Sequence, residues 1–378
     1  MNPPITSTQV VFLVNGDNKS AMADRARAFA DLLRGSWRID IAYRDDGRFR
    51  SIANFLAVLR RERPLAIWVF DMAVAGVVAG TISKATGTRM VIDTGDAITA
   101  LARQAARGAA NVAATAALER LALRAADAIV VRGTEHQRLL KGRGIDSTLI
   151  PDGVDITAFH PGAGPSEWRA RLKLQDQLVV GLIGSIVWNP ALDLIYGWDL
   201  VEALHKLRDL PIAAVIVGDG SGLTHLQSRA AELGVSDRIR FVGRQPMTNL
   251  SGLLNACDVC ISTQTNDMVG RVRTTGKLPL YMASGRYVLA SRVGEAARVL
   301  PDEMLIDYQG TRDAGYPERL AARLGTLCGD RSRLARGLAM TDVARREFSY
   351  DTLATRVDRV LTGLVGQRRI PATVQDSA

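Results

Sequence analysis

The segment 274–291 combines a small polar turn, a lysine and a helix pattern in an order that suits phosphate binding. The turn, 274–276, runs directly into Lys277. Pro279 falls within the first turn of the predicted helix and Gly285 falls where it would end, which is the polarity these residues give helices. The unpaired N–H groups of the first turn, together with the lysine ammonium, could hold a phosphate.

Three cationic side chains on this loop are candidates for contact with a phosphate. Lys277 would supply a positive charge to a bound phosphate, and the alternative is a solvated surface lysine. Arg271 and Arg273 alternate along the loop, so at most one should face the site, and Arg273 is preferred. We therefore predict Lys277 and Arg273 as catalytic cations.

The remaining residues of the turn are predicted to bind substrate. Thr274 and Thr275 could donate hydroxyls to a phosphate, and a threonine there could also cap the helix. Gly276 and Leu278 would contribute backbone N–H groups from the start of the helix.

Length and composition predict a two-domain globular protein. A single core seldom grows past about 250–300 residues, and this chain has 378. The net charge of +9 is spread over both halves without a basic block, which argues against dedicated nucleic-acid binding. The mild excess still suits anionic ligands or loose contact with an anionic membrane surface.

The cysteines and the N-terminus predict a cytoplasmic protein. There are only three cysteines, which argues against a disulfide scaffold, and Cys257 and Cys260 are expected to be buried structural thiols. The first ten residues lack the charged and apolar regions of a signal peptide. The longest apolar stretch, 65–82, contains Asp71 and predicts a strand followed by a packed helix.

β-branched runs alternate with segments of helical period along the whole chain, which predicts two parallel, doubly wound sheets. The predicted strands are 10–14, 38–43, 66–71, 89–93, 128–131, 148–150, 178–184, 212–218, 238–243, 259–262 and 287–290. The predicted helices include 21–33, 52–61, 72–84, 97–126, 193–207, 222–233 and 348–365. Two such α/β domains would place the carboxyl ends of both sheets around one cleft.

Several motifs of the second half are similar, in order and spacing, to glycosyltransferase family 4, the retaining nucleotide-sugar enzymes of the GT-B fold. These motifs are PDGVDITAFHPG (151–162), VVGLIGS (179–185), residues 216–244, LLNACDVCIS (253–262), KLPLYMASGRYVLAS (277–291) and FSYDTLATRV (348–356). The first half matches more loosely, through residues 15–33. The resemblance implies two Rossmann-like domains facing across a cleft.

The resemblance also implies how the chain divides. Residues 1–162 would bind the acceptor and residues 163–348 the nucleotide-sugar donor. Helix 349–366 would cross back to the first domain, and 367–378 would form a flexible tail.

The sequence departs from the family pattern at three places. Val272 and Leu280 stand where the family usually has two glutamates. Residues 185–190 lack the Arg/Lys pair that the family tends to place after the first strand of the donor domain. Asp93 and Asp96 follow the fourth strand of the first half, where the family often has a histidine.

Loop residues of the first half are candidate acceptor contacts. Asn15, Gly16, Asp17 and Lys19 follow the first strand and would touch acceptor or phosphate, with an ordinary turn as the alternative. Asp96 could orient the acceptor hydroxyl or cap a helix.

In the second half, four loop residues are predicted to line the donor site. Gly218 and Gly220 follow a strand and allow close backbone approach, although this pattern alone is a weak signal. The resemblance adds Ser185 to the donor site. It also implies that Arg244 stacks on the base, and the alternative is an exposed side chain. His136 is expected on an exposed helical turn. No histidine or carboxylate spacing indicates a metal site.

Together these features predict a metal-independent glycosyltransferase that takes a nucleoside-diphosphate sugar as co-substrate and needs no other cofactor. The acceptor stays open among saccharides, lipid-linked molecules and small molecules. A sugar-nucleotide epimerase or phosphorylase of the same fold is one alternative. A non-catalytic nucleotide-binding or scaffold protein is another, favoured by the missing glutamates.

Overall fold

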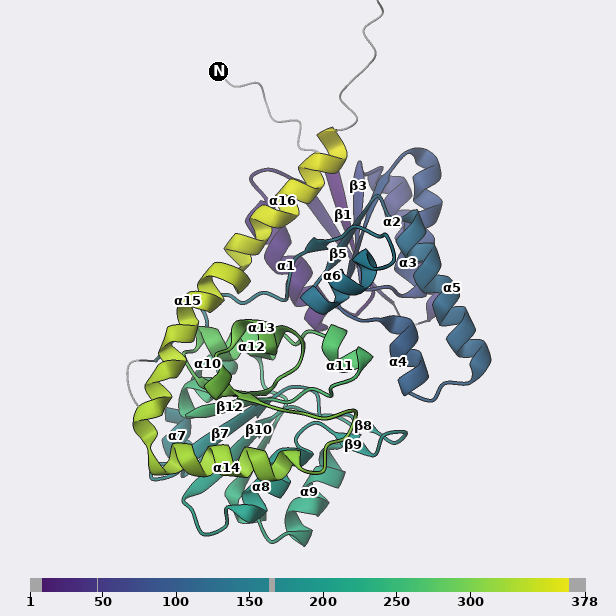
Figure 1. Ribbon diagram of the computed structural model, residues 1–378. Coiled ribbons are helices and arrows are strands. Elements are labelled where there is room, and N and C mark those ends of the chain that lie inside the picture. Colours follow the sequence, from purple (N-terminus) through teal and green to yellow (C-terminus); the bar gives the residue numbers. More distant parts are fainter. Residues whose placement is uncertain (1–8, 46, 163–166, 367–378) are drawn as a thin grey trace, which may run out of the picture. The chain divides into compact units, whose positions relative to one another are not determined.

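The computed structural model describes residues 9–45, 47–162 and 167–366, which divide into two compact units (Figure 1). The chain leaves the first unit between Pro151 and Asp152 and returns to it between Ser349 and Tyr350. Part of the linker around the predicted boundary at 162, and the proposed tail 367–378, lie outside the described residues.

The first unit is built on a six-stranded parallel sheet with the order β2-β1-β3-β4-β5-β6. Its strands are β1 (Gln9–Val14), β2 (Arg38–Tyr43), β3 (Ala66–Phe70), β4 (Arg89–Thr94), β5 (Ala128–Val131) and β6 (Thr148–Leu149). Its helices are α1 (Ala21–Leu33), α2 (Arg48–Glu62), α3 (Val74–Ser83), α4 (Ile98–Gln104), α5 (Ala109–Ala125), α6 (Thr134–Lys141) and α16 (Tyr350–Gly366).

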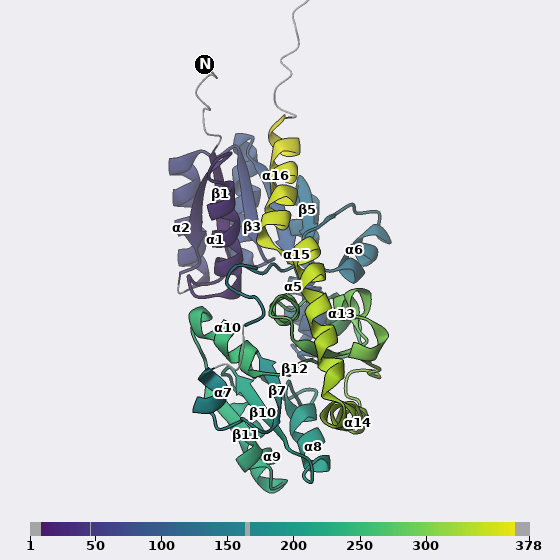
Figure 2. The same ribbon diagram turned by 90° about the vertical axis from the view of Figure 1, so that its left-hand side faces the viewer.

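Helices cover both faces of this sheet, which explains why its central strands are almost uniformly apolar. On one face, α1 and α16 pack over Phe12 and Trp68. On the other, α2, α3 and α5 pack over Leu13 and Val69. Figures 1 and 2 show α16 running alongside α1, and the two helices are in contact. The predicted return of the last helix to the first domain is therefore confirmed.

The second unit holds another six-stranded parallel sheet, with the order β11-β10-β7-β12-β13-β14. Its strands are β7 (Leu178–Ile183), β10 (Ile212–Val217), β11 (Ile239–Gly243), β12 (Val259–Ser262), β13 (Tyr287–Ser291) and β14 (Leu305–Ile306), with a separate hairpin of β8 (Trp188–Asn189) and β9 (Leu194–Ile195). Its helices are α7 (Glu167–Arg171), α8 (Trp198–Lys206), α9 (Leu223–Glu232), α10 (Met247–Ala256), α11 (Met268–Val272), α12 (Lys277–Ala283), α13 (Gly294–Val299), α14 (Tyr316–Gly329) and α15 (Arg336–Phe348).

Two predicted helices differ from the observed ones. The region 97–126 is two helices, α4 and α5, because Ala106 adopts a left-handed backbone (φ 50°) and Gly108 follows it at the start of α5. The helix predicted over 193–207 begins only at Trp198, because β8 and β9 pair as a hairpin and Gly197 turns the chain with φ 115°.

The apolar stretch 65–82 forms β3 and most of α3, as predicted. In the parts of the chain that the structure describes, no helix is both long and apolar enough to cross a lipid bilayer. Cys257 and Cys260 are buried free thiols that form no disulfide, in agreement with a structural role.

Candidate functional site

The loops that leave β7 and β10 are packed against each other, and glycines make this contact possible. A Cβ atom on Gly218 (φ 146°) would lie 1.8 Å from the carbonyl oxygen of Gly184. A Cβ atom on Gly220 (φ 150°) would lie 2.4 Å from the carbonyl oxygen of Ile186. Both glycines are therefore required for backbone packing at the carboxyl edge of the sheet.

The N–H groups of these glycines are already used inside the protein. Gly218 donates to the carbonyl of Gly243 over 2.9 Å, and Gly220 donates to the Asp219 carboxylate over 2.7 Å. By contrast, Ser185 is exposed, and its N–H and hydroxyl have no partner in the described ranges. Of the predicted donor-site residues on these two loops, Ser185 thus has donors available to a ligand.

Lys277 begins α12, and its side chain reaches the end of β7. Its Nζ atom lies 5.7 Å from the centroid of the Tyr196 ring and 3.9 Å from a Cβ atom placed on Gly184. The side chain is partly buried, and no carboxylate pairs with it among the described residues. Burial lowers the pKa of Lys277 to about 8, so the ammonium is still mostly protonated at pH 7. An unpaired cation in this position is suited to bind an anion.

The turn before α12 supplies backbone donors beside this lysine. The N–H groups of Thr275, Gly276 and Lys277 have no acceptor in the described ranges. The N–H of Leu278 bonds to the Thr275 carbonyl over 3.2 Å and its side chain is buried, so Leu278 is not an available donor. Since α12 has only seven residues, the charge at this site comes chiefly from Lys277.

The other predicted residues of this unit occupy less direct positions. The Thr274 hydroxyl donates to the Asp152 carboxylate over 2.8 Å, which fastens the loop to the start of the second unit. Arg273 is half-buried, whereas Arg271 and Arg244 are exposed. That Arg273 rather than Arg271 faces the donor site stays a prediction.

The two positions where the family has glutamates are packed into the core. Val272 is 1% exposed, and Leu280 is partly buried against the hydrophobic core of the second unit. A carboxylate at Val272 would therefore be buried in this arrangement, at a cost unless it is paired.

In the first unit, Asn15 is a structural clamp. Its Nδ2 donates to the carbonyls of Phe70 and Asp71 over 3.1 and 2.7 Å, and its Oδ1 accepts from the Gly76 N–H over 2.9 Å. All of its donors and its acceptor oxygen are engaged, and the residue is buried. It shapes the turn between β3 and α3 instead of presenting polar atoms to a ligand.

Residues 16–19 form a turn that leads into α1. The Asp17 carboxylate accepts from the Lys19 N–H over 2.9 Å, and its carbonyl accepts from the Ser20 hydroxyl over 2.7 Å. Ser20 caps α1. Asp17 and Lys19 are exposed, and Gly16 is half-buried in a position where a Cβ atom would meet the Ser20 hydroxyl at 2.4 Å.

Asp93 is a buried structural carboxylate and not an acceptor contact. Arg25 Nε and Arg132 Nε lie 3.1 and 3.0 Å from its two oxygens, and Trp68 Nε1 donates to it over 3.2 Å. Although burial alone would raise the pKa of Asp93, the two guanidinium groups hold it below its usual value. Asp96, three residues later, is half-buried at the carboxyl edge of β4 and remains the candidate.

His136 is buried, contrary to the prediction of an exposed helical turn. It lies on the inner face of α6 with Leu140, one helical turn away, and is 2% exposed. Burial lowers its pKa to about 4, and its Nδ1 has no hydrogen-bond partner in the described ranges. The imidazole is therefore neutral at pH 7.

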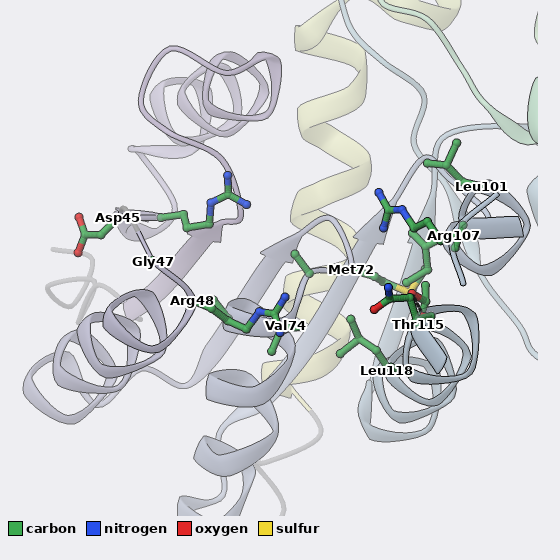
Figure 3. Close-up of a pocket in the computed structure, with 16 residues that line it drawn as sticks. Asp45, Gly47, Arg48, Met72, Val74, Leu101, Arg107, Thr115 and Leu118 are labelled. Atoms are coloured by element: carbon green, nitrogen blue, oxygen red, sulfur yellow. Dashed lines mark hydrogen bonds between the residues drawn. The ribbon is translucent and has the colours of Figure 1, made fainter. Parts of the chain in front are cut away.

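A cavity of about 640 Å³ opens within the first unit and was not predicted from the sequence (Figure 3). It is lined by residues that follow the carboxyl ends of β2, β3 and β4 and by the facing side of α5. Three arginines contribute to it, namely Arg44, Arg48 and Arg107. Two of them belong to the sequence RDDGRFR directly after β2, a charge cluster that could have indicated the site.

Comparison with known proteins finds one family model that matches most of the second unit. Residues 177–330 match the family model described as Glycosyl transferases group 1. The matched region includes the β7 and β10 loops and Lys277.

Curated relatives match over part of their length. The D-inositol 3-phosphate glycosyltransferase of Nocardia farcinica is 31% identical over 224 residues, which are 56% of this chain and 47% of the relative. The protein of the same name from Stackebrandtia nassauensis is 32% identical over 245 residues, or 60% and 52%. The chain thus spans about half the length of the curated relatives it matches.

Solved structures resemble this protein along nearly the whole chain. Anabaena HepE in complex with UDP-glucose has a TM-score of 0.75 at 17% identity, covering 94% of this chain and 99% of that one. Sucrose-phosphate synthase from Thermosynechococcus elongatus has a TM-score of 0.74 at 16% identity, covering 95% and 100%. At such identities the likeness shows the fold alone. The chain has the GT-B fold, with two Rossmann-like sheets and a C-terminal helix that packs on α1.

Proposed function

We propose that this protein transfers a sugar from a nucleoside-diphosphate sugar to a hydroxyl acceptor. The observation that carries the proposal is the Lys277 ammonium, partly buried without a carboxylate partner at the carboxyl edge of the second sheet. This position lies within the region that matches the group 1 glycosyl transferases. The solved complex of HepE with UDP-glucose supports a nucleotide-sugar donor.

In this reaction the diphosphate leaves the sugar and its developing charge needs stabilisation. Lys277 supplies a positive charge, and the free N–H groups of the preceding turn supply hydrogen bonds. Ser185, after β7, offers a further N–H and hydroxyl, and Arg273 is a second candidate cation. Most of the acceleration would come from positioning and charge stabilisation.

We also propose that the new glycosidic bond retains the configuration of the donor. The acceptor oxygen attacks the sugar carbon from the face that the diphosphate leaves. The bond to the diphosphate oxygen breaks, and that leaving phosphate takes the acceptor proton. Asp96 in the first unit is the candidate for orienting the acceptor hydroxyl. This chemistry needs few side chains and no metal.

Turnover of a panel of nucleotide sugars tests the proposal. Each sugar is incubated with the protein and candidate acceptors, and the released nucleoside diphosphate is measured. Lys277→Ala should lower the rate about 100-fold or more, the scale of losing one oriented charge donor. Lys206→Ala is the control, since Lys206 pairs with Glu318 on the surface. An unchanged rate in Lys277→Ala removes this lysine from the mechanism.

A non-catalytic nucleotide-binding protein is the second candidate. It is favoured by Val272 and Leu280, which leave apolar side chains where the family has carboxylates. Nucleotide binding without turnover of any sugar in the panel would select this candidate.

The location and the membrane contact are also proposals. A cytoplasmic location is supported by the free state of all three cysteines. Loose contact with an anionic membrane is supported by Phe49, which is 85% exposed between Arg48 and Arg50.

A further inference from the structure

The cavity of the first unit has the size of a small-molecule site. Its volume of about 640 Å³ falls within the range of ligand pockets, roughly 300–1,000 Å³. It lies at the carboxyl ends of parallel strands, where open α/β sheets bind ligands. Ile98, which lines it, stands two positions after Asp96. The cavity therefore adjoins the turn that carries the candidate acceptor contact.

The lining of the cavity carries more positive than negative charge, with three arginines and one aspartate. Arg44, Arg48 and Arg107 have no carboxylate partner for their side chains within the described parts of the chain. The aspartate, Asp45, accepts from Asn54 Nδ2 over 3.0 Å. Guanidinium groups without a counter-charge bind phosphate oxygens in bidentate geometry.

The floor of the cavity is apolar. Met72 and Val74 approach from the turn after β3, Leu101 from α4, and Leu118 from α5 (Figure 3). Val74, Leu101 and Leu118 are only partly covered by the rest of the protein. Hydrocarbon placed against this floor would be removed from water, which favours binding.

We propose that this cavity binds an amphiphilic phosphate, in which the phosphate lies against the arginines and a hydrocarbon body lies on the apolar floor. The arginines do not bind the hydrocarbon and the apolar floor does not bind the phosphate. A ligand therefore needs both groups for full affinity. Resting on the proposed function, this ligand is the acceptor, and its hydroxyl would lie toward Asp96.

Calorimetric titration with hexyl phosphate, inorganic phosphate and hexanol tests the cavity directly. Hexyl phosphate should bind more tightly than either fragment. Arg48→Ala should weaken hexyl phosphate about tenfold or more, the loss expected for one charged hydrogen-bonding group. Leu118→Asn should weaken hexyl phosphate but leave inorganic phosphate unchanged. Equal affinity for hexyl phosphate and inorganic phosphate would overturn the proposal.

Two variants control for the location of the anion. Arg60→Ala removes an exposed arginine twelve positions along α2, roughly 18 Å away, and should leave hexyl phosphate binding unchanged. Lys277→Ala should also leave it unchanged. If instead Lys277→Ala abolishes hexyl phosphate binding and Arg48→Ala does not, the anion binds in the second unit and the proposal is wrong.

Binding to lipid vesicles distinguishes a lipid headgroup from a soluble phosphate as the natural ligand. Arg48-dependent binding to phosphatidylcholine vesicles containing phosphatidic acid, competed by hexyl phosphate, would identify a lipid headgroup as the source. Binding of hexyl phosphate alone would identify a soluble phosphate, and either result supports the cavity. A parallel titration with nucleoside diphosphates keeps the two hypotheses apart. If nucleotides bind and hexyl phosphate does not, only the proposed cavity ligand is wrong. If hexyl phosphate binds and nucleotides do not, only the proposed donor site is wrong.

Discussion

Lys277 and Asp93 are both charged side chains withdrawn from water, but the protein surrounds them differently. Asp93 is held between Arg25 and Arg132 and is fully buried. Lys277 has no carboxylate within the described residues, and its ammonium is desolvated without compensation. Buried charges are normally paired because an isolated one is costly. The unpaired lysine is therefore best explained by an anionic ligand, and the paired aspartate by the fold.

The pKa of Lys277 gives the first prediction, a fall in diphosphate affinity as the pH rises. Because burial lowers this pKa to about 8, the ammonium loses its proton above that pH and no longer attracts the anion. The loss should approach about tenfold per pH unit beyond the pKa. In Lys277→Arg the cation stays protonated, since arginine has a pKa above about 12, and the fall between pH 8 and 9.5 should disappear.

The lowered pKa of Lys277 also predicts how the free energy of unfolding changes with pH. Between pH 8 and 10.5 the unfolded chain holds the Lys277 proton and the folded chain does not, so stability should rise with pH there. Urea unfolding and titration of a nucleoside diphosphate at each pH measure both effects. An affinity that is level through pH 9.5 in the unaltered protein would exclude Lys277 as the cation.

At the scale of elements, one ion-pair network joins the helices and strands of the first unit. Arg25 extends from α1 to Asp93 on β4 and also donates to the carbonyls of Ile150 and Pro151. Arg132, directly after β5, bonds to Asp93 and to Asp71. The network therefore fixes the carboxyl edge of the sheet and the point where the chain leaves the unit.

Asp93→Asn should destabilise the first unit strongly. Removing the carboxylate charge leaves Arg25 buried without a counter-charge and leaves Arg132 paired with Asp71 alone. Breaking a buried ion pair in this way costs about 3–5 kcal/mol. Urea denaturation followed by circular dichroism measures the change. Asp24→Asn is the control, because Asp24 pairs with Arg27 on the surface, where such pairs contribute about 0–1 kcal/mol. A loss in Asp93→Asn no larger than in this control would show that the network does not stabilise the fold.

Local sequence was sufficient to predict most elements but not the contacts between distant ones. Helix α1 was predicted at its observed bounds, because Ser20 caps it and its apolar residues repeat at helical spacing. The β8–β9 hairpin was missed because each strand has only two residues. His136 was misplaced because the side of α6 that packs depends on tertiary contacts.

The sequence was enough to predict the backbone donors of the candidate site, but not which side chains meet in the folded protein. The free N–H groups before α12 follow from the local turn, and the structure has them. In contrast, nothing in a single sequence shows that Arg25, Asp93 and Arg132 meet. For the same reason the sequence did not indicate that Asp93 is held in an ion-pair network, and the choice of Asp96 as the acceptor contact stays a prediction.

At the scale of the whole molecule, the exposed Phe49 gives a prediction about membranes. An aromatic side chain flanked by Arg48 and Arg50 can insert at an anionic surface while the arginines contact headgroups. Phe49→Ser should weaken binding to vesicles containing phosphatidylglycerol about tenfold, the effect of losing one buried aromatic group. Co-sedimentation measures it, with Leu338→Ser as the control, since Leu338 is 50% exposed in the second unit. Binding to neutral and anionic vesicles alike would contradict the predicted contact.

The central claim is that the second unit binds a nucleoside diphosphate through Lys277. Calorimetric titration with UDP, GDP, ADP and TDP tests it on the unaltered protein, on Lys277→Ala and on the control Lys206→Ala. The proposal predicts saturable binding of at least one diphosphate, unchanged in Lys206→Ala and weakened about tenfold or more in Lys277→Ala. Absence of binding for all four nucleotides, or equal affinity in Lys277→Ala, would contradict it.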